Sequence, residues 1–138
     1  MRLALKTEYA CQVLAQLARS FGSETVRQVD DLARAEALSP NYLVQILTGL
    51  RGAGLVVSRR GKHGGYLLAR HPGEITLAEI VAAMEGERLV ESSPGNGGQS
   101  AASVREIWQR VDQAALRECR GIVLSDMITD EATGDWMI

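Results

Sequence analysis

Residues 38–70 read LSPNYLVQILTGLRGAGLVVSRRGKHGGYLLAR, and this stretch predicts a helix followed by a β-hairpin. Ser39 can accept a hydrogen bond from the first turn of a helix, and Pro40 fits the first helical position because its missing N–H is not needed there. The apolar residues that follow recur at helical spacing. Two short apolar runs, residues 55–58 and 66–69, then flank a basic, glycine-rich turn, which is typical of two antiparallel strands.

The residues before this stretch predict two more helices. Apolar residues at helical spacing mark a helix over residues 3–19, and Gly22 supplies a stop signal after it. We expect Thr25 to open a short second helix and residues 35–38 to form the turn into the helix that starts at Ser39. Two helices joined by a tight turn and followed by a hairpin have the order of a winged helix-turn-helix.

The residues after the hairpin predict a capped helix, a loop and a long helix. Thr76 can cap a helix over residues 77–84, whereas residues 86–103 have little apolar bulk and are expected to form a loop. Helical spacing resumes at Val104 and continues in our prediction to Met127. A helix of this length needs a surface to bury against, and a second subunit is the simplest one. Its apolar residues are Val104, Ile107, Trp108, Val111, Ala115, Leu116, Ile122, Val123 and Met127.

Charge is divided unevenly along a chain whose net charge is only −2. Residues 1–73 carry ten Lys or Arg and five acidic residues, whereas residues 74–138 carry five and twelve. There is no acidic residue between Glu36 and Glu74. A basic field confined to one half of an acidic protein points to a polyanionic partner, and double-stranded DNA suits the helix order.

The chain is therefore expected to be mainly α with a small β-hairpin wing. Its predicted divisions are a winged helix-turn-helix DNA-binding domain over 1–85, a flexible sensor-type loop over 86–103, and a dimerisation helix with a C-terminal tail over 104–138. No apolar run approaches the roughly 18 residues of a membrane span, and residues 1–20 carry charges inside a helical pattern. We expect a cytoplasmic protein without a membrane partner.

The second helix of the pair and the wing supply the candidate DNA-binding residues. In this geometry the N-terminal side chains of that helix face base edges in the major groove. Asn and Gln can make paired hydrogen bonds to adenine, and basic wing residues can neutralise phosphates or enter the minor groove. The candidates are Ser39, Asn41, Tyr42, Gln45 and Arg51 on the helix, and Arg59, Arg60, Lys62 and His63 in the wing.

Three segments together carry a resemblance to a known family. They are LKTEYACQVLAQLA at residues 5–18, the stretch 38–70, and ITLAEIVAAMEG at residues 75–86. The sequence resembles the Rrf-type family of bacterial winged-helix transcriptional regulators, of the IscR, NsrR and CymR type. The resemblance implies a homodimer whose C-terminal helices cross between subunits, a palindromic operator, and phosphate contacts from Thr7 and Tyr9 on the first helix. It places the function in transcriptional regulation, as a repressor in our interpretation, related to cysteine or sulfur supply, iron–sulfur status, or redox and nitrosative stress.

This chain departs from the family's sequence pattern in the segment that serves many members as a sensor. Many members bind an iron–sulfur cluster through three cysteines in the loop after the ITLAEIVAAMEG helix, but the corresponding segment here, ESSPGNGGQSAASVREIW at residues 91–108, contains no cysteine. Because thiolates are the ligands that such clusters need, we expect no cofactor here. The alternative is an iron–sulfur or redox sensor with unusual ligation, for which Glu8 and Cys119 are the candidate ligands, or one whose ligands were removed by mutation.

The C-terminal residues GDWMI at 134–138 leave two interpretations open. An acidic-then-apolar tail resembles those by which some family members bind cysteine synthase, whereas packing of Trp136 and Ile138 on the dimer is the reading we favour. An enzyme is not expected, because no phosphate-binding Gly-rich loop, Ser/His/Asp set or nucleophile elbow is present. A protein-interaction module without DNA binding is disfavoured by the intact basic hairpin.

Overall fold

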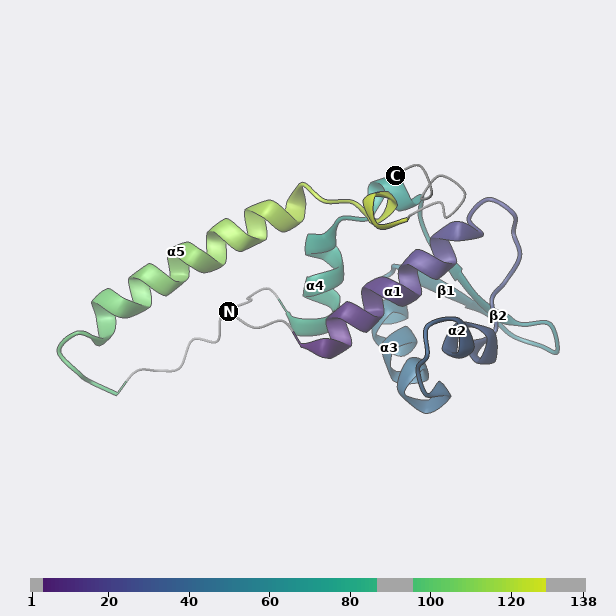
Figure 1. The fold of residues 1–138 in the computed structure, drawn as a ribbon, viewed down its shortest axis with the longest axis horizontal. Coiled ribbons are helices and arrows are strands. Elements are labelled where there is room, and N and C mark those ends of the chain that lie inside the picture. Colours follow the sequence, from purple (N-terminus) through teal and green to yellow (C-terminus); the bar gives the residue numbers. More distant parts are fainter. Residues whose placement is uncertain (1–3, 87–95, 129–138) are drawn as a thin grey trace, which may run out of the picture.

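The computed structural model describes residues 4–86 and 96–128, which form a compact head with one long helix projecting from it (Figure 1). The head contains α1 (Leu5–Arg19), α2 (Val29–Ala35), α3 (Pro40–Gly52), the hairpin β1 (Val56–Arg59) and β2 (Gly65–Leu68), and α4 (Leu77–Glu85). Two short 3₁₀ turns, η1 (Pro72–Glu74) and η2 (Leu124–Met127), complete it, and α5 (Ala101–Arg120) is the projecting helix. The prediction of a mainly α fold with a β-hairpin wing and a long C-terminal helix is confirmed.

The three helices of the helix-turn-helix surround a continuous apolar core. One face of α1 and one face of α3 are buried, as the 3.6-residue spacing of their apolar residues requires. The side chains at the centre are fully buried and come from α1, α2, α3, α4 and η2; they are Leu14, Leu32, Leu43, Ile46, Leu47, Leu50, Ile80 and Leu124. Packing against this core fixes the orientation of α3 in the head, and hence which side of α3 faces outward.

The N-terminus of α3 forms as its sequence predicts. The Ser39 hydroxyl oxygen accepts a hydrogen bond from the backbone N–H of Tyr42 at 3.2 Å, and Pro40 occupies the first helical turn. The second helix begins later than predicted, because α2 starts at Val29 and not at Thr25. The backbone of Arg27 is used in a β-bridge instead: its N–H and carbonyl exchange hydrogen bonds with Tyr66 at 2.9 and 2.8 Å.

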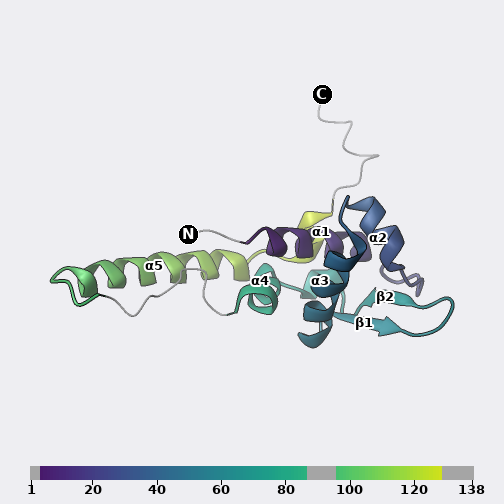
Figure 2. The same cartoon turned by 90° about the horizontal axis from the view of Figure 1, so that it is seen from below.

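The wing is a two-stranded antiparallel sheet in which Val56 pairs with Leu68 and Arg59 pairs with Gly65. The bridge from Arg27 adds a third, single-residue edge to it. Gly65 is required at that edge because a Cβ there would lie 2.5 Å from the carbonyl oxygen of Arg27. Gly61 in the turn has a φ of +109°, a conformation that L side chains rarely adopt. Figure 2 shows the hairpin extending from the head on the side opposite to α5.

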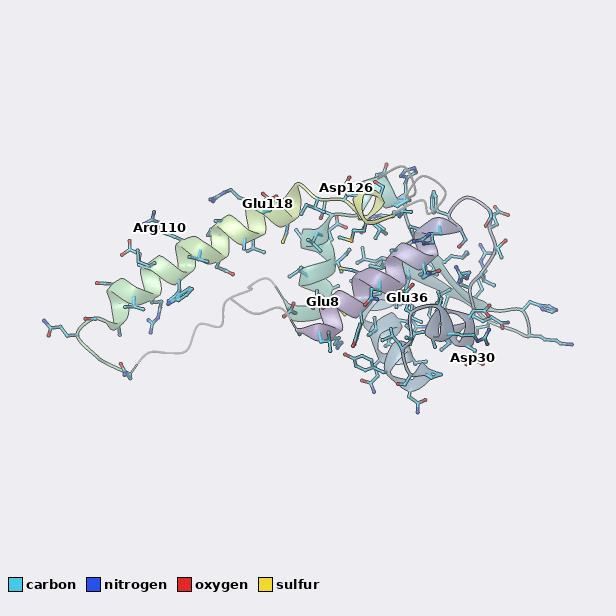
Figure 3. All side chains as sticks on the ribbon, viewed as in Figure 1. Glu8, Asp30, Glu36, Arg110, Glu118 and Asp126 are labelled. Carbon is cyan, nitrogen blue, oxygen red and sulfur yellow. The ribbon has the colours of Figure 1, made fainter. Side chains whose placement is uncertain are left out.

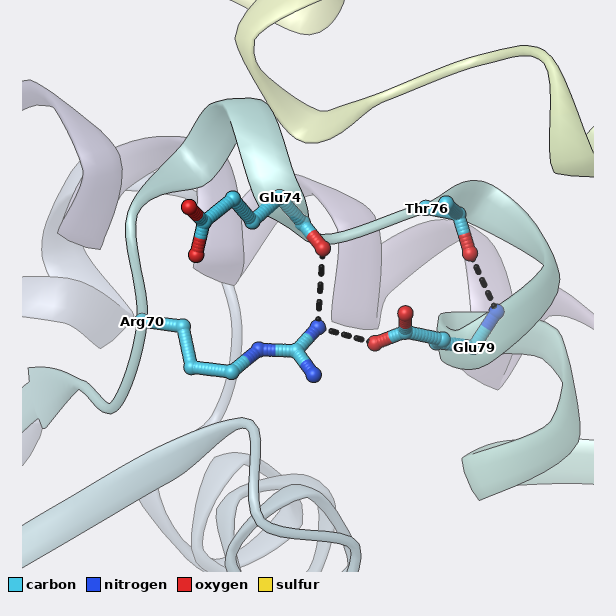
Figure 4. A network of polar contacts seen from close by, with 4 residues as sticks. All are labelled: Arg70, Glu74, Thr76 and Glu79. Carbon is cyan, nitrogen blue, oxygen red and sulfur yellow. Dashed lines mark hydrogen bonds and ion pairs between the residues drawn. The ribbon is translucent and has the colours of Figure 1, made fainter.

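A polar network closes the connection between the wing and α4 (Figure 4). The guanidinium of Arg70 donates to the carbonyl oxygen of Glu74 at 3.0 Å and forms an ion pair with the Glu79 carboxylate. The Thr76 hydroxyl oxygen accepts from the backbone N–H of Glu79 at 3.1 Å, so Thr76 is the cap that the sequence predicts. The positive charge of Arg70 is therefore paired with a carboxylate at the surface of the head, between β2 and α4.

The segment after α5 does not continue that helix, contrary to the expectation that helical spacing extends to Met127. The helix ends at Arg120, and the chain turns back onto the head. The backbone N–H of Leu77 donates to Ile122 at 2.8 Å, and the N–H of Leu124 donates to Ile75 at 2.8 Å. Leu124 is fully buried in the core of the head. Leu124 and Met127 thus pack against the core of their own domain instead of extending the helix.

The projecting helix α5 starts three residues earlier than predicted, at Ala101, and carries an exposed apolar stripe. Val104, Ile107 and Trp108 are each about half exposed, at 51%, 52% and 48% of their surface. Residues 104, 107, 108 and 111 share one face of a helix. Within residues 4–86 and 96–128, no helix is both long enough and apolar enough to span a membrane. Residues 87–95 of the predicted sensor-type loop and the whole GDWMI tail lie outside the described residues, and residues 101–103 of that loop belong to α5.

Candidate nucleic-acid interface

The outward face of α3 carries amide side chains one helical turn apart. Asn41 and Gln45 are both exposed, and they flank the N-terminal half of the helix on the side away from the core. Ser39 is exposed too, although its hydroxyl oxygen is engaged in capping the helix. The spacing of four residues places the two amides side by side along the helix, where they could contact neighbouring base pairs.

The structure brings Tyr9 and Tyr42, two of the predicted contact residues, against each other. Their rings meet edge to face, with centroids 5.9 Å apart and planes at 89°. Both are half-buried and pack against the core of the head. This pair therefore connects α1 directly to the first turn of α3. The ring contact packs α1 against α3, and contact of either hydroxyl with phosphate stays a prediction.

Thr7 is placed differently from what the resemblance implies. It is only 1% exposed, and its hydroxyl donates to a carboxylate oxygen of Glu85 at 2.7 Å. The other oxygen of Glu85 accepts from the backbone N–H of Ala4 at 3.1 Å. Thr7 thus joins the start of α1 to the end of α4 and has no free surface for phosphate in this conformation. Sequence spacing alone could not show this, because Glu85 lies 78 residues away.

We expect Thr7→Val to destabilise the head without changing its electrostatic attraction to DNA. The substitution keeps the shape of the side chain but leaves the Glu85 carboxylate without its hydroxyl donor, at a cost of about 1 kcal/mol. Urea unfolding measures the first effect, and the slope of log affinity against log salt concentration measures the second. A variant as stable as the wild type that binds a duplex more weakly at one salt concentration would show that Thr7 contacts phosphate after all, because a neutral hydroxyl affects affinity without affecting the slope.

The wing supplies the exposed cations. Arg59, Arg60, Lys62 and His63 are all exposed, and neither of the two ion pairs found in residues 4–86 and 96–128 involves them. Arg51 is exposed at the end of α3, where its guanidinium donates to the Ser58 hydroxyl at 3.2 Å. This bond joins the end of α3 to β1. The positive side chains of the wing and the polar face of α3 consequently belong to one connected part of the head.

Two residues of α3 that the sequence prediction omitted share the face of Asn41 and Gln45. Val44 is 41% exposed, and Thr48 is exposed. They lie three and seven residues after Asn41, so helical spacing would have identified them. Val44 is apolar and adjoins the buried Leu43, Ile46 and Leu47, so residue type alone assigns it to the core.

The thiols do not form a cluster-binding set. The whole chain has two cysteines, Cys11 and Cys119, so three-thiolate ligation is impossible. Burial, with the Glu8 carboxylate and Cys119 adding to it, raises the pKa of the Cys11 thiol to about 11. Burial also raises the pKa of Cys119, and the negative charge of Glu118 raises it further. Both thiols are therefore protonated at neutral pH.

Carboxylates and histidines do not complete a site around these thiols. Within the described ranges no group of three or more His, Cys, Asp or Glu side chains could hold a metal ion. Figure 3 shows Glu8 near the start of α1 and Glu118, the neighbour of Cys119, near the end of α5. The donor set of this chain therefore does not fit the iron–sulfur cluster that the resemblance implies for many members.

Comparison with known proteins identifies the family. Residues 3–130 match the Rrf2 family, described as "Iron-dependent Transcriptional regulator". The chain belongs to the Rrf2 family. It is 46% identical to a protein of Mycobacterium tuberculosis named as an HTH-type transcriptional regulator, over 97% of this chain and 82% of that protein. It is 32% identical to the HTH-type transcriptional regulator CymR of Bacillus subtilis, over 92% of this chain and 89% of CymR.

Solved structures of Rrf2 regulators share the fold. The structure of CymR from B. subtilis, the global cysteine regulator, matches with a TM-score of 0.78 at 30% identity, over 94% of this chain and 99% of CymR. The structure of T. potens IscR matches with a TM-score of 0.73 at 32% identity, over 92% of this chain and 85% of that one. This Rrf2 protein is a DNA-binding transcriptional regulator, as the sequence predicts, and its relatives are regulators and not enzymes.

Proposed function

We propose that this Rrf2 protein is a cytoplasmic homodimer that represses transcription by binding an inverted-repeat operator without an iron–sulfur cluster. The observation that carries the proposal is the connected surface formed by the outward face of α3 and the unpaired cations of the wing. The amides of Asn41 and Gln45 would read base edges in the major groove. Arg59, Arg60, Lys62 and His63 would neutralise phosphates beside it or enter the minor groove.

The remaining candidates have supporting roles in this proposal. Ser39 holds the first turn of α3 at the groove, and Tyr42, supported by Tyr9, fixes its position relative to α1. Arg51 connects α3 to β1, so the helix and the wing would dock together. We leave Thr7 out of the interface because its hydroxyl is buried against Glu85.

The stripe on α5 supports the homodimer. Val104, Ile107 and Trp108 are about half exposed on a helix that leaves the head, and no element among the described residues covers them. Apolar side chains at this spacing are buried when two helices pack together. Because the chain returns to the head after Arg120, a change in how the α5 helices pack would be transmitted through η2 to the position of α3.

The experiment combines selection of DNA with disruption of the stripe. The wild-type chain is equilibrated with random-sequence duplexes, and the bound fraction is sequenced; we expect an inverted repeat whose half-sites are one helical turn, about 34 Å, apart. Ile107→Glu should make the protein monomeric in sedimentation and remove cooperative binding to both half-sites. Gln113→Glu is the matched control, since it adds the same charge to an exposed residue on the opposite face of α5.

The outcomes separate the parts of the proposal. A dimeric Ile107→Glu variant would refute the assignment of the interface to this stripe. Selection of single, unrepeated sites would refute the palindromic operator. A wild-type protein that enriches no sequence at all would refute sequence-specific binding by this surface.

A further inference from the structure

The outward face of α3 has an apolar centre between polar neighbours. Val44 is 41% exposed, whereas the next apolar side chains along the helix, Leu43 and Ile46, are completely buried. Asn41 precedes Val44 by three residues and Thr48 follows it by four, so the three side chains lie along one line on the helix surface. Val44 is not one of the buried side chains of the core, and its exposed surface is presented to whatever α3 contacts.

Thr48 extends this apolar character. Its hydroxyl donates to the backbone carbonyl of Val44 at 2.8 Å, one turn earlier in the same helix. The proton of this hydroxyl is therefore used within α3, as is common for threonine inside helices. The methyl group of Thr48 is then available for contact with a partner, beside the two methyl groups of Val44. Together they make a small apolar patch flanked by the Asn41 and Gln45 amides.

The major groove offers one apolar group that such a patch can recognise. Thymine carries a C5-methyl group there, and cytosine presents a hydrogen atom at the same position and an amino donor nearby. Adenine, the partner of thymine, presents the acceptor and donor pair to which Asn or Gln can form two hydrogen bonds. An apolar side chain next to two amides is therefore matched chemically to A·T pairs and mismatched to G·C pairs, which carry no methyl group.

We propose that Val44, supported by the Thr48 methyl group, is a specificity-determining residue that contacts thymine C5-methyl groups in the operator half-site. This inference rests on the proposed function, because it requires α3 to lie in the major groove. It assigns an A·T-containing step to the base pairs beneath the centre of α3. It also distinguishes Val44 from the cations of the wing. Those cations would bind any duplex, whereas Val44 carries no charge and would contribute to sequence preference alone.

The test removes the thymine C5-methyl group from the DNA and, separately, shortens the Val44 side chain of the protein. Duplexes selected by the wild-type protein are remade with deoxyuridine in place of each thymine, one position per half-site at a time. This change deletes the methyl group and keeps base pairing. We expect at least one position at which wild-type affinity falls about fourfold per half-site, the value of one buried methyl group. In Val44→Ala the same change should have almost no effect, and the salt dependence of binding should match that of the wild type.

The control variant is Val57→Ala, which shortens an equally exposed valine (43%) on β1. It should keep the wild-type ratio of thymine to deoxyuridine affinity. Wild-type binding that is unchanged by deoxyuridine at every position would overturn the inference, as would an equal loss in the wild type and Val44→Ala. Either result would leave the proposed function standing, because a site was selected. Failure to select any site would overturn the proposed function and this inference with it.

Discussion

Replacing Arg59 and Arg60 together by alanine should weaken binding to all duplexes, whatever their sequence. Both residues are exposed at the end of β1 and in the turn of the wing, and neither takes part in an ion pair found in the described parts of the chain. Each phosphate neutralised by a cation contributes about 0.9 to the slope of log affinity against log salt concentration. At roughly 0.1 M salt each lost contact therefore weakens binding on the order of tenfold, and a dimer loses both copies.

Fluorescence anisotropy with a labelled duplex at several salt concentrations measures this effect. The matched control is Arg110→Ala with Arg117→Ala, which removes the same two charges from exposed residues of α5 (Figure 3 shows Arg110). The control should keep a slope close to that of the wild type, because both residues belong to α5, which lies on the side of the head opposite to the wing (Figure 2). Equal slopes for the wing variant and the wild type would contradict the assignment of the wing to the DNA backbone.

Leu124→Ala should strongly destabilise the head, although the residue lies beyond the projecting helix. Leu124 lies in η2, beyond the projecting helix, yet it is completely buried in the core of the head. Truncating a fully buried leucine to alanine costs about 2–5 kcal/mol of unfolding free energy, since it loses apolar burial and leaves a cavity. The head should unfold at a correspondingly lower urea concentration.

The control for this substitution is the next residue along the chain. Ser125 is exposed, and Ser125→Ala should change the unfolding free energy by no more than about 0.5 kcal/mol. All variants should be compared at one protein concentration, because the stability of a dimer depends on it. A loss below about 0.5 kcal/mol for Leu124→Ala would show that residues 122–128 are not part of the head in solution. It would also remove the route by which α5 influences α3.

The local order of the head could be predicted because its signals are local. The Ser39-Pro40 start of α3, the glycine-bounded hairpin and the Thr76 cap each depend on residues within a few positions of one another. The family followed from the same stretches, and the two-cysteine count excluded a three-thiolate cluster without any structure. The start of α2 could not be predicted in this way, because Arg27 bridges to Tyr66, and this contact joins residues far apart in the sequence.

The sequence by itself therefore determined the order of the elements, the position of the helix proposed to enter the major groove and the basic character of the wing, since these depend on spacing and composition. Only the tertiary structure decided which side chains are free to contact DNA. Thr7 is bonded to Glu85 and Arg70 is paired with Glu79, whereas Val44 is left exposed by the angle of α3 on the core. It also decided that residues 122–127 return to the head, because a periodic apolar pattern specifies that a face is buried but not against what.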